Sequence, residues 1–214
     1  MRRVMYYSHE IFSVLVLVLL TASAVFVTPD VPQAVVLVFA FLFLLHEWEE
    51  NDYPGGFFDM LLREVANIRP VPSGARLRES RVGVYLLLSA FIFPPYFLHE
   101  HAWLVLPIVY LGIFEGIAHT LVIHVFRLKR RYTPGMVTAL CQITASVAAL
   151  VVLAGGHLIE GWQYAAAVLI LIAGLACMAT IGMTHNGLRP TDMPRMMLRN
   201  LRAVRAGERE APEA

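Results

Sequence analysis

Residues 31–50 read VPQAVVLVFAFLFLLHEWEE, a nearly unbroken apolar run that ends in a histidine and three glutamates. A helix needs about 20 mostly apolar residues to cross the hydrocarbon core of a membrane. A strand buried in a soluble protein is usually much shorter than this run. The stretch therefore predicts a membrane-spanning helix with its polar residues gathered at one end.

Five further stretches have the same apolar character. With residues 31–48 they predict an all-α, polytopic membrane helix bundle of about six transmembrane helices. A single transmembrane domain is expected over 1–188 and a basic cytoplasmic tail over 189–214. The other five expected spans are 11–28, 82–98, 102–126, 135–154 and 162–183.

The composition agrees with a membrane protein. Hydrophobic residues make up 58% of the 214 residues and charged residues 15%, whereas a soluble domain has about 45–50% and 25%. Such a chain is too apolar to be disordered, and a net charge of +1 does not suit a nucleic-acid-binding protein. Cys141 and Cys177 lie inside apolar runs without a CxxC pair, so we expect both to be buried and without a redox role.

The basic residues predict how the bundle is oriented. All 17 Lys and Arg lie before the first span, in alternate connections, or after the last span. Cytoplasmic loops carry the excess of Lys and Arg in membrane proteins. We therefore expect a multi-pass protein of the cell inner (cytoplasmic) membrane, with both termini in the cytoplasm.

The first span has a second interpretation. Arg2 and Arg3, the apolar run and the sequence Ala22-Ser23-Ala24 also resemble a cleavable signal peptide. Glu10 directly before the run and the continuation of the run to Val27 favour a retained helix instead. Cleavage would leave the remaining topology unchanged.

Two basic segments have amphipathic patterns. An interfacial helix is expected over about 57–68, and residues 193–205 place methionines and arginines on opposite faces. Helices of this kind lie on membranes and bind anionic lipid headgroups, so membrane lipid is the expected partner of the basic loops and tail. Alternatively, these arginines only complete the charge asymmetry that orients the chain.

Two groups of polar residues fall at a common depth. Glu49 and Glu50 flank His46 at helical spacing, and Glu115 precedes His119 by four residues. At about 1.5 Å per residue, His46 lies roughly 22 Å into its span, Glu115 roughly 20 Å and His119 roughly 26 Å. His185 closes the last span on the same side.

These side chains predict a site. Charged groups inside a membrane usually pair or serve a function, and several carboxylates cannot remain ionised together in a low dielectric. A divalent metal ion, Fe, Mn or Zn, would neutralise them. The proposed metal ligands are His46, Glu49, Glu50, His119 and His185, with Glu115 and Tyr132 as catalytic groups. The alternative is a set of hydrogen-bonded helix ends in a wet interfacial layer.

Three short motifs resemble those of the HXXEE-domain family of small bacterial and archaeal membrane proteins. His46-Glu47-Trp48-Glu49-Glu50 fits its H-x-x-E-E signature, and Tyr132-Thr133-Pro134-Gly135 fits its Y-x-P-G signature. The family's N-x-x-x-H becomes Glu115-x-x-x-His119 here, which adds a negative charge. The resemblance implies a membrane protein with an enzymatic role and no established reaction.

The leading functional hypothesis is a metal-dependent membrane enzyme acting on a lipid or other apolar substrate. A di-iron centre would favour oxidation, and a zinc centre would favour hydrolysis. An ion- or proton-coupled transporter using the same carboxylates and histidines is the second hypothesis. A helper protein whose polar cluster only holds helices together is the third.

Overall fold

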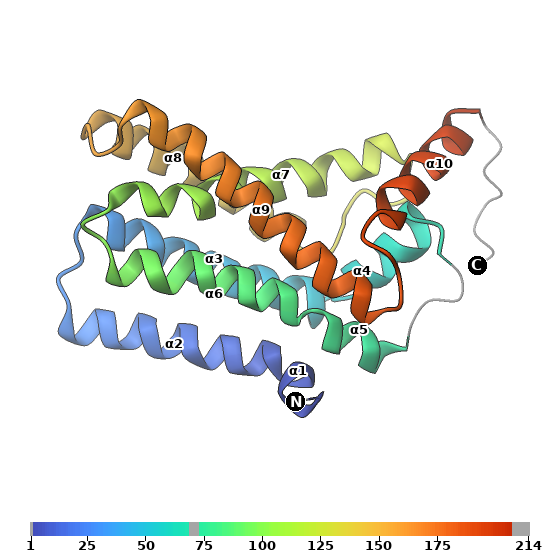
Figure 1. The fold of residues 1–214 in the computed structure, drawn as a ribbon, viewed down its shortest axis with the longest axis horizontal. Helices are drawn as coiled ribbons and strands as arrows, with labels where there is room; N and C mark the ends of the chain where they lie inside the picture. The colour runs from blue at the N-terminus through green and yellow to red at the C-terminus, as the bar shows by residue number, and fades with distance from the viewer. Residues whose placement is uncertain (1, 69–72, 207–214) are drawn as a thin grey trace.

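The computed structural model describes residues 2–68 and 73–206, and within these ranges the regular structure is helical throughout. Arg69, Arg209 and the end of the expected basic tail lie outside the described residues. Figure 1 shows long, roughly aligned helices with short ones gathered at one end. In chain order the elements are α1 (Arg2–Tyr6), α2 (Ser8–Phe26), α3 (Val31–Asn51), α4 (Phe57–Met60), the π-helical turn η1 (Leu61–Val65), α5 (Gly74–Ser80), α6 (Val82–Phe97), the 3-10 turn η2 (Ala102–Val105), α7 (Leu106–Val125), α8 (Met136–Gly155), α9 (Gly161–His185) and α10 (Asp192–Ala206).

Six helical segments of the described chain are long and apolar enough to cross a membrane, which confirms the predicted architecture. Five of them begin and end close to the expected positions. The third starts earlier than expected, because α5 leads directly into α6. The six segments are Ser8–Phe26, Val31–Asn51, Gly74–Phe97, Ala102–Val125, Met136–Gly155 and Gly161–His185.

Helix α3 lies at the centre of the bundle, in contact with α2, α6, α7 and α8. Its start is fixed by a capping box. The Gln33 amide donates to Asp30 Oδ1 at 2.9 Å, and the Asp30 amide donates to Gln33 Oε1 at 3.3 Å. Such reciprocal bonds satisfy backbone donors that a helix start leaves unpaired. The cap sets where α3 begins, and therefore how far along the bundle its polar end lies.

Two glycines bring α7 and α8 into close contact. A Cβ atom on Gly112 would lie 2.6 Å from Ser146 Oγ, and one on Gly116 would lie 2.8 Å from Ile143 Cβ. Small residues four apart allow this approach between membrane helices. The Ser146 hydroxyl also donates to the Val109 carbonyl at 2.8 Å. The polar residues of α7 are thereby held beside the start of α8.

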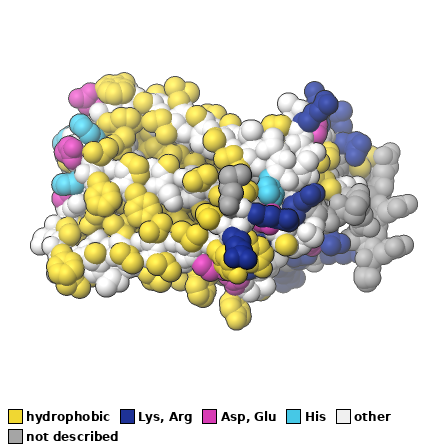
Figure 2. Space-filling model, turned by 60° about the horizontal axis from the view of Figure 1, so that its bottom comes forward, with side chains coloured by type: hydrophobic (Ala, Val, Ile, Leu, Met, Phe, Trp, Pro, Cys, Tyr) yellow, Lys and Arg dark blue, Asp and Glu magenta, His cyan; other side chains and the backbone are white. Residues whose placement is uncertain are grey.

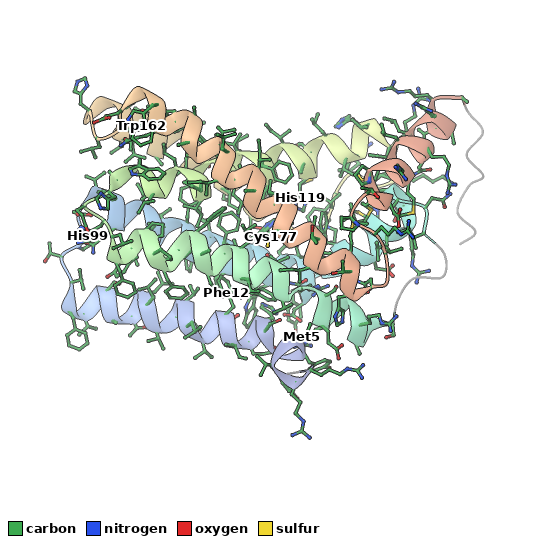
Figure 3. The ribbon with its side chains drawn as sticks, viewed as in Figure 1. Met5, Phe12, His99, His119, Trp162 and Cys177 are labelled. Atoms are coloured by element: carbon green, nitrogen blue, oxygen red, sulfur yellow. The ribbon has the colours of Figure 1, made fainter. Side chains whose placement is uncertain are left out.

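Charge separates along the bundle. Helices α1, α5 and α10 lie toward one end, which we call the basic end, and the α2–α3 and α8–α9 connections lie at the other (Figure 1). The space-filling view shows Lys and Arg concentrated toward the basic end, with apolar side chains covering the middle (Figure 2). His99 and Trp162 lie at the opposite end (Figure 3). Both ends of the described chain are therefore near the basic end.

Two cysteines and one segment lie in surroundings different from those predicted from the sequence. Cys141 and Cys177 were expected to be buried, and this prediction is wrong, because both are exposed on the outer surface of the bundle. The segment expected as an interfacial helix is helical over 57–65 and packs on α10 through an apolar cluster. That cluster contains Met60, Val65, Phe126 and Leu128, with Met197 and Leu201 of α10 against it.

Candidate metal site

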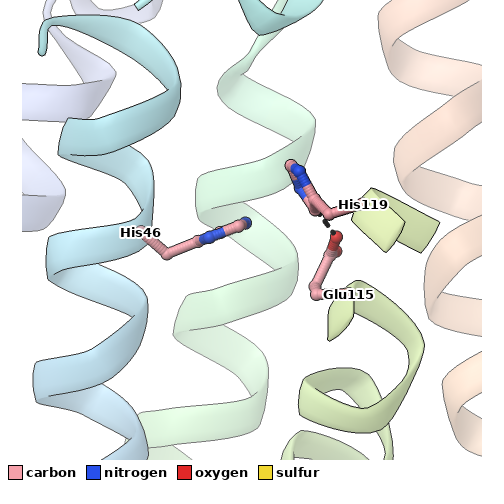
Figure 4. Close-up of side chains that lie close together, drawn as sticks. All are labelled: His46, Glu115 and His119. Atoms are coloured by element: carbon pink, nitrogen blue, oxygen red, sulfur yellow. Dashed lines mark ion pairs between the residues drawn. The ribbon is translucent and has the colours of Figure 1, made fainter. Parts of the chain in front are cut away.

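Two histidines and two glutamates from α3 and α7 converge near the basic end. His46, Glu115 and His119 place one donor atom each within 4.8 Å of the others, a group that could hold a metal ion. Figure 4 shows His46 pointing from α3 toward His119 and Glu115 on α7. Glu50 joins them, with its Oε1 3.5 Å from His46 Nε2 and 3.1 Å from His119 Nε2. Glu115 Oε2 lies 3.8 Å from His119 Nε2.

Both imidazole rings are oriented by hydrogen bonds at Nδ1. His46 Nδ1 lies 3.1 Å from the Gly135 carbonyl and 2.9 Å from Thr138 Oγ1. His119 Nδ1 lies 3.0 Å from Thr133 Oγ1. A carbonyl can only accept, so the proton of neutral His46 is on Nδ1 and its Nε2 carries the lone pair. Metal-binding histidines are commonly oriented in this way.

The Nε2 atom of His119 is a buried polar atom without a hydrogen-bond partner. The His119 side chain is 1% exposed, and the Phe57 ring stacks on it with centroids 4.5 Å apart. Leaving such an atom unpaired costs about 1–3 kcal/mol. The unpaired atom lies 3.1 Å from Glu50 Oε1, and the centroids of the His46 and His119 rings are 5.1 Å apart.

Gly135 packs directly against this group. Its φ of +90° is a conformation that favours glycine. A Cβ atom there would lie 2.7 Å from His119 Cε1, 2.8 Å from Glu50 Cγ and 2.9 Å from His46 Cε1. We expected helix 135–154 to include Gly135, but the residue precedes the first turn of α8 and closes the side of the site.

Glu49 is turned toward α8 instead of toward the histidines. Its carboxylate accepts from the Val137 amide at 3.1 Å and from the Thr138 amide and hydroxyl at 2.9 and 2.6 Å. The Tyr132 hydroxyl donates to it at 2.7 Å. These bonds occupy both oxygens and satisfy backbone donors at the start of α8. Glu49 therefore anchors α8. Glu50 is the glutamate of the H-x-x-E-E motif that contacts the two histidines.

Tyr132 acts as a donor in this arrangement. Burial raises the pKa of the Tyr132 phenol, and the hydrogen bond to negatively charged Glu49 raises it further. The hydroxyl consequently stays protonated at neutral pH. Its position supports a structural bond to Glu49, and the structure does not bring it to the four converging side chains.

His185 also lies apart from the group. Its Nε2 is 3.2 Å from Glu79 Oε2, and Arg2 Nε donates to the other oxygen of Glu79 at 2.7 Å. This contact joins α9 to α5 and α1. The structure thus brings His46, Glu50, Glu115 and His119 together and places Glu49 and His185 in other contacts.

Sequence reasoning missed the groups that orient the site. Thr133 and Thr138 carried no signal of their own, although Thr133 lies inside the Y-x-P-G motif. Glu47 faces the side of α3 away from the two histidines, toward Asn51. It is nevertheless buried and accepts from Asn51 Nδ2 at 3.1 Å.

The four donors match the chemistry of a transition-metal site. Ligand atoms about 2.0–2.1 Å from a shared ion lie about 3.3 Å apart in a tetrahedron. The measured separations of 3.1, 3.5 and 3.8 Å between donors bracket that value. Two imidazole nitrogens and two carboxylates suit zinc, iron(II) or manganese(II). His46, Glu115 and His119 therefore form a group that could hold a metal ion, and Glu50 contacts both histidines.

Comparison with known proteins gives a family match over just over half of the chain. A family described as "Protein of unknown function with HXXEE motif" matches residues 37–150. No curated protein and no solved structure matches this chain. The matched region contains α7, the α7–α8 connection and most of α3 and α8, which together carry the converging residues and the groups that orient them.

Proposed function

This chain belongs to the HXXEE family, and we propose that it is a membrane enzyme that binds one divalent metal ion near the cytoplasmic end of its bundle. His46, His119 and Glu50 are the ligands in this proposal. Glu115 completes the coordination or acts as the base beside a metal-bound water. The substrate is a lipid or another apolar molecule that enters from the membrane.

One observation carries the proposal. His46 and His119, from different helices, each use Nδ1 for a hydrogen bond and turn Nε2 toward the same carboxylate. His119 Nε2 has no hydrogen-bond partner there. A purely structural histidine cluster would be expected to satisfy that atom, whereas a metal ligand must keep it free.

The number of donors favours one ion over two. Di-iron and di-manganese bundles use four glutamates and two histidines from four helices. In this protein Glu49 is occupied by α8 and His185 by Glu79. Hydrolytic zinc sites are composed of two histidines and one carboxylate, with a further carboxylate nearby. A metal ion supplies a polarised, acidified water in such a site.

The partial exposure of the Glu115 side chain supports the proposal that substrate enters from the membrane. Its side chain is 22% exposed, while His46, His119 and Glu50 are buried. The neighbouring Phe114 and Ile117 are exposed apolar residues on the same helix. A carboxylate beside a lipid-facing surface would meet apolar molecules first, and aqueous solutes only through the basic end.

The core of the bundle argues against the transporter hypothesis. Between the His/Glu group and the opposite end, α3 and α7 bury a mostly apolar cluster, and α8 adds the buried polar side chains Gln142 and Ser146. An ion path would need a longer series of polar groups than these two. Buried residues of this cluster include Val36, Phe39, Phe43, Ile108 and Leu111.

Metal content measured on purified variants tests the proposal. His46→Ala and His119→Ala should each lose most of the metal, because each removes a ligand and leaves buried carboxylates uncompensated. Glu115→Gln should lose less than either histidine variant. His124→Ala is the matched control, since His124 lies on the same helix but is exposed.

Elemental analysis of protein purified without chelator should give close to one metal ion per chain. The metal proposal is wrong if the wild type carries no stoichiometric metal and added Fe, Mn or Zn does not raise its melting temperature. Normal stability and metal content in both histidine variants would leave the group with a structural role.

A further inference from the structure

A second polar site lies on the other side of α3. A cavity of roughly 180 Å³ opens between the ends of α2, α3, α5 and α6 at the basic end. It holds the volume of about six water molecules and is smaller than a typical drug-sized pocket. The residues that matter among its lining are His9, Asn51, Asp52, Arg78, Arg81 and Tyr85.

Three polar atoms of the lining have no hydrogen-bond partner. They are His9 Nε2, Asn51 Oδ1 and Arg81 Nε, each buried in the described structure. Buried polar groups are nearly always paired. Their concentration in one cavity makes it a place where a bound molecule can complete their hydrogen bonds.

The neighbours of these atoms define which kind of partner each one needs. Asn51 Nδ2 donates to Glu47 and to the Tyr85 hydroxyl, both at 3.1 Å, so its Oδ1 is left to accept. His9 Nδ1 lies 3.4 Å from Asp52 Oδ2, which places the proton on Nδ1 and a lone pair on Nε2 of the neutral ring.

The two arginines of the cavity are hydrogen-bond donors, so they need an acceptor. Arg78 contacts Glu10 and donates from Nε to the Tyr6 carbonyl at 3.1 Å, so it is already paired. Arg81 stacks over the Phe58 ring, 5.3 Å from Cζ to the centroid, and its Nε is the unpaired donor. A guanidinium in this situation binds an anionic oxygen, and phosphate fits its geometry.

We propose that this cavity binds a phosphoethanolamine-type group, in which a phosphate is joined by a short chain to a primary ammonium. The phosphate accepts from Arg81. The three ammonium protons meet Asn51 Oδ1, His9 Nε2 and the Asp52 carboxylate at the rim. Basic pockets between membrane helices at the cytoplasmic surface recognise lipid headgroups, and the cavity lies at the ends of four helices there.

This site is separate from the metal site. Glu47 and Asn51 share one face of α3, whereas His46 and Glu50 share another. The inference therefore goes beyond the proposed function, and either site can fail its test without the other.

Binding of soluble headgroups to delipidated protein in detergent tests the inference. Glycerophosphoethanolamine should bind with a dissociation constant on the order of 1 mM, the range for a ligand of this size. Glycerophosphocholine, which lacks N–H donors, and inorganic phosphate, which lacks the ammonium, should bind at least about tenfold more weakly. Calorimetry or ligand-observed NMR measures all three.

Variants identify the cavity as the place of binding. Arg81→Gln should weaken binding about tenfold or more. His9→Phe keeps the ring that stacks on Tyr85 with centroids 5.5 Å apart, removes Nε2, and should weaken binding without loss of metal. Arg63→Gln is the control, since Arg63 pairs with Asp59 outside the cavity.

The assignment is overturned if glycerophosphoethanolamine does not bind at about 10 mM, or if His9→Phe and Arg81→Gln bind it as well as Arg63→Gln does. Equal binding of glycerophosphocholine would contradict the proposed hydrogen bonds from a primary ammonium to Asn51 Oδ1 and His9 Nε2. Equal binding of inorganic phosphate would identify free phosphate, not a lipid headgroup, as the ligand.

Discussion

Gly135 meets two structural requirements of the site, a close approach to its side chains and a positive φ. Gly135→Ala would push a methyl group against His46, Glu50 and His119. We expect the free energy of unfolding to fall by about 1–3 kcal/mol and metal binding to be lost. Chemical unfolding and metal content measure the two effects. Gly155→Ala, at the other end of α8 with open space around its Cβ, should change neither; equal behaviour of the two variants would contradict the geometry.

The adjacent glutamates of α3 should behave differently when neutralised. Glu49→Gln weakens the anchoring of the start of α8 and should lower stability by about 1 kcal/mol while metal is retained. Glu50→Gln should lose metal, because Glu50 Oε1 lies between both histidine Nε2 atoms. Melting temperature and metal content of the two variants separate these roles. Loss of metal in Glu49→Gln alone would show that the roles are reversed.

At the scale of elements, α10 secures the short helices that cover the site. Asn200 Nδ2 donates to the Glu64 and Val65 carbonyls at 3.1 and 2.8 Å. Met197 and Leu201 pack on the same cluster as Phe57, whose ring lies on His119. Met197 and Leu201, part of the amphipathic face predicted for this segment, thus contact the protein itself.

Asn200→Ala should loosen this cover. Each lost hydrogen bond contributes about 0.5–1.5 kcal/mol, so amide hydrogen exchange over 57–65 should become roughly tenfold faster or more. Mass spectrometry of exchanged peptides measures the change. Arg199→Ala, an exposed neighbour on α10, is the control. Unchanged exchange in Asn200→Ala would mean that α10 does not hold these turns.

At the scale of the whole molecule, the charge distribution predicts orientation. Reporter fusions after residues 75, 130 and 210 should all score cytoplasmic, because the Lys and Arg cluster at that end. In a variant without Cys141 and Cys177, a cysteine at 99 or 157 should react with an impermeant reagent in intact cells, and one at 130 should not. Labelling at 130 without labelling at 157 would invert the bundle and move the His/Glu group to the outer leaflet.

The six spans could be predicted because length and hydropathy alone determine whether a helix can cross a membrane. The sequence could not predict which face of a span is buried in the protein, because lipid and protein core are equally apolar. Cys141 and Cys177 were misjudged for this reason. At the site, Glu49 and Glu50 lie about 60° and 40° on opposite sides of His46 around the helix. Only the positions of α7 and α8 decide which glutamate reaches the histidines.

The contacts between α3 and the start of α8 also determine when the site can exist during synthesis. His46 leaves the ribosome before Thr138, its hydrogen-bond partner, by roughly 5–18 s at 5–20 residues per second. During that interval the newly inserted α3 carries its histidine and glutamates without their partners on α7 and α8. Their place at the end of the span, close to the headgroup layer, keeps them within reach of water until α7 and α8 arrive. A nascent chain that ended before residue 138 could not orient the His46 ring and should be recognised as unfinished by membrane proteases.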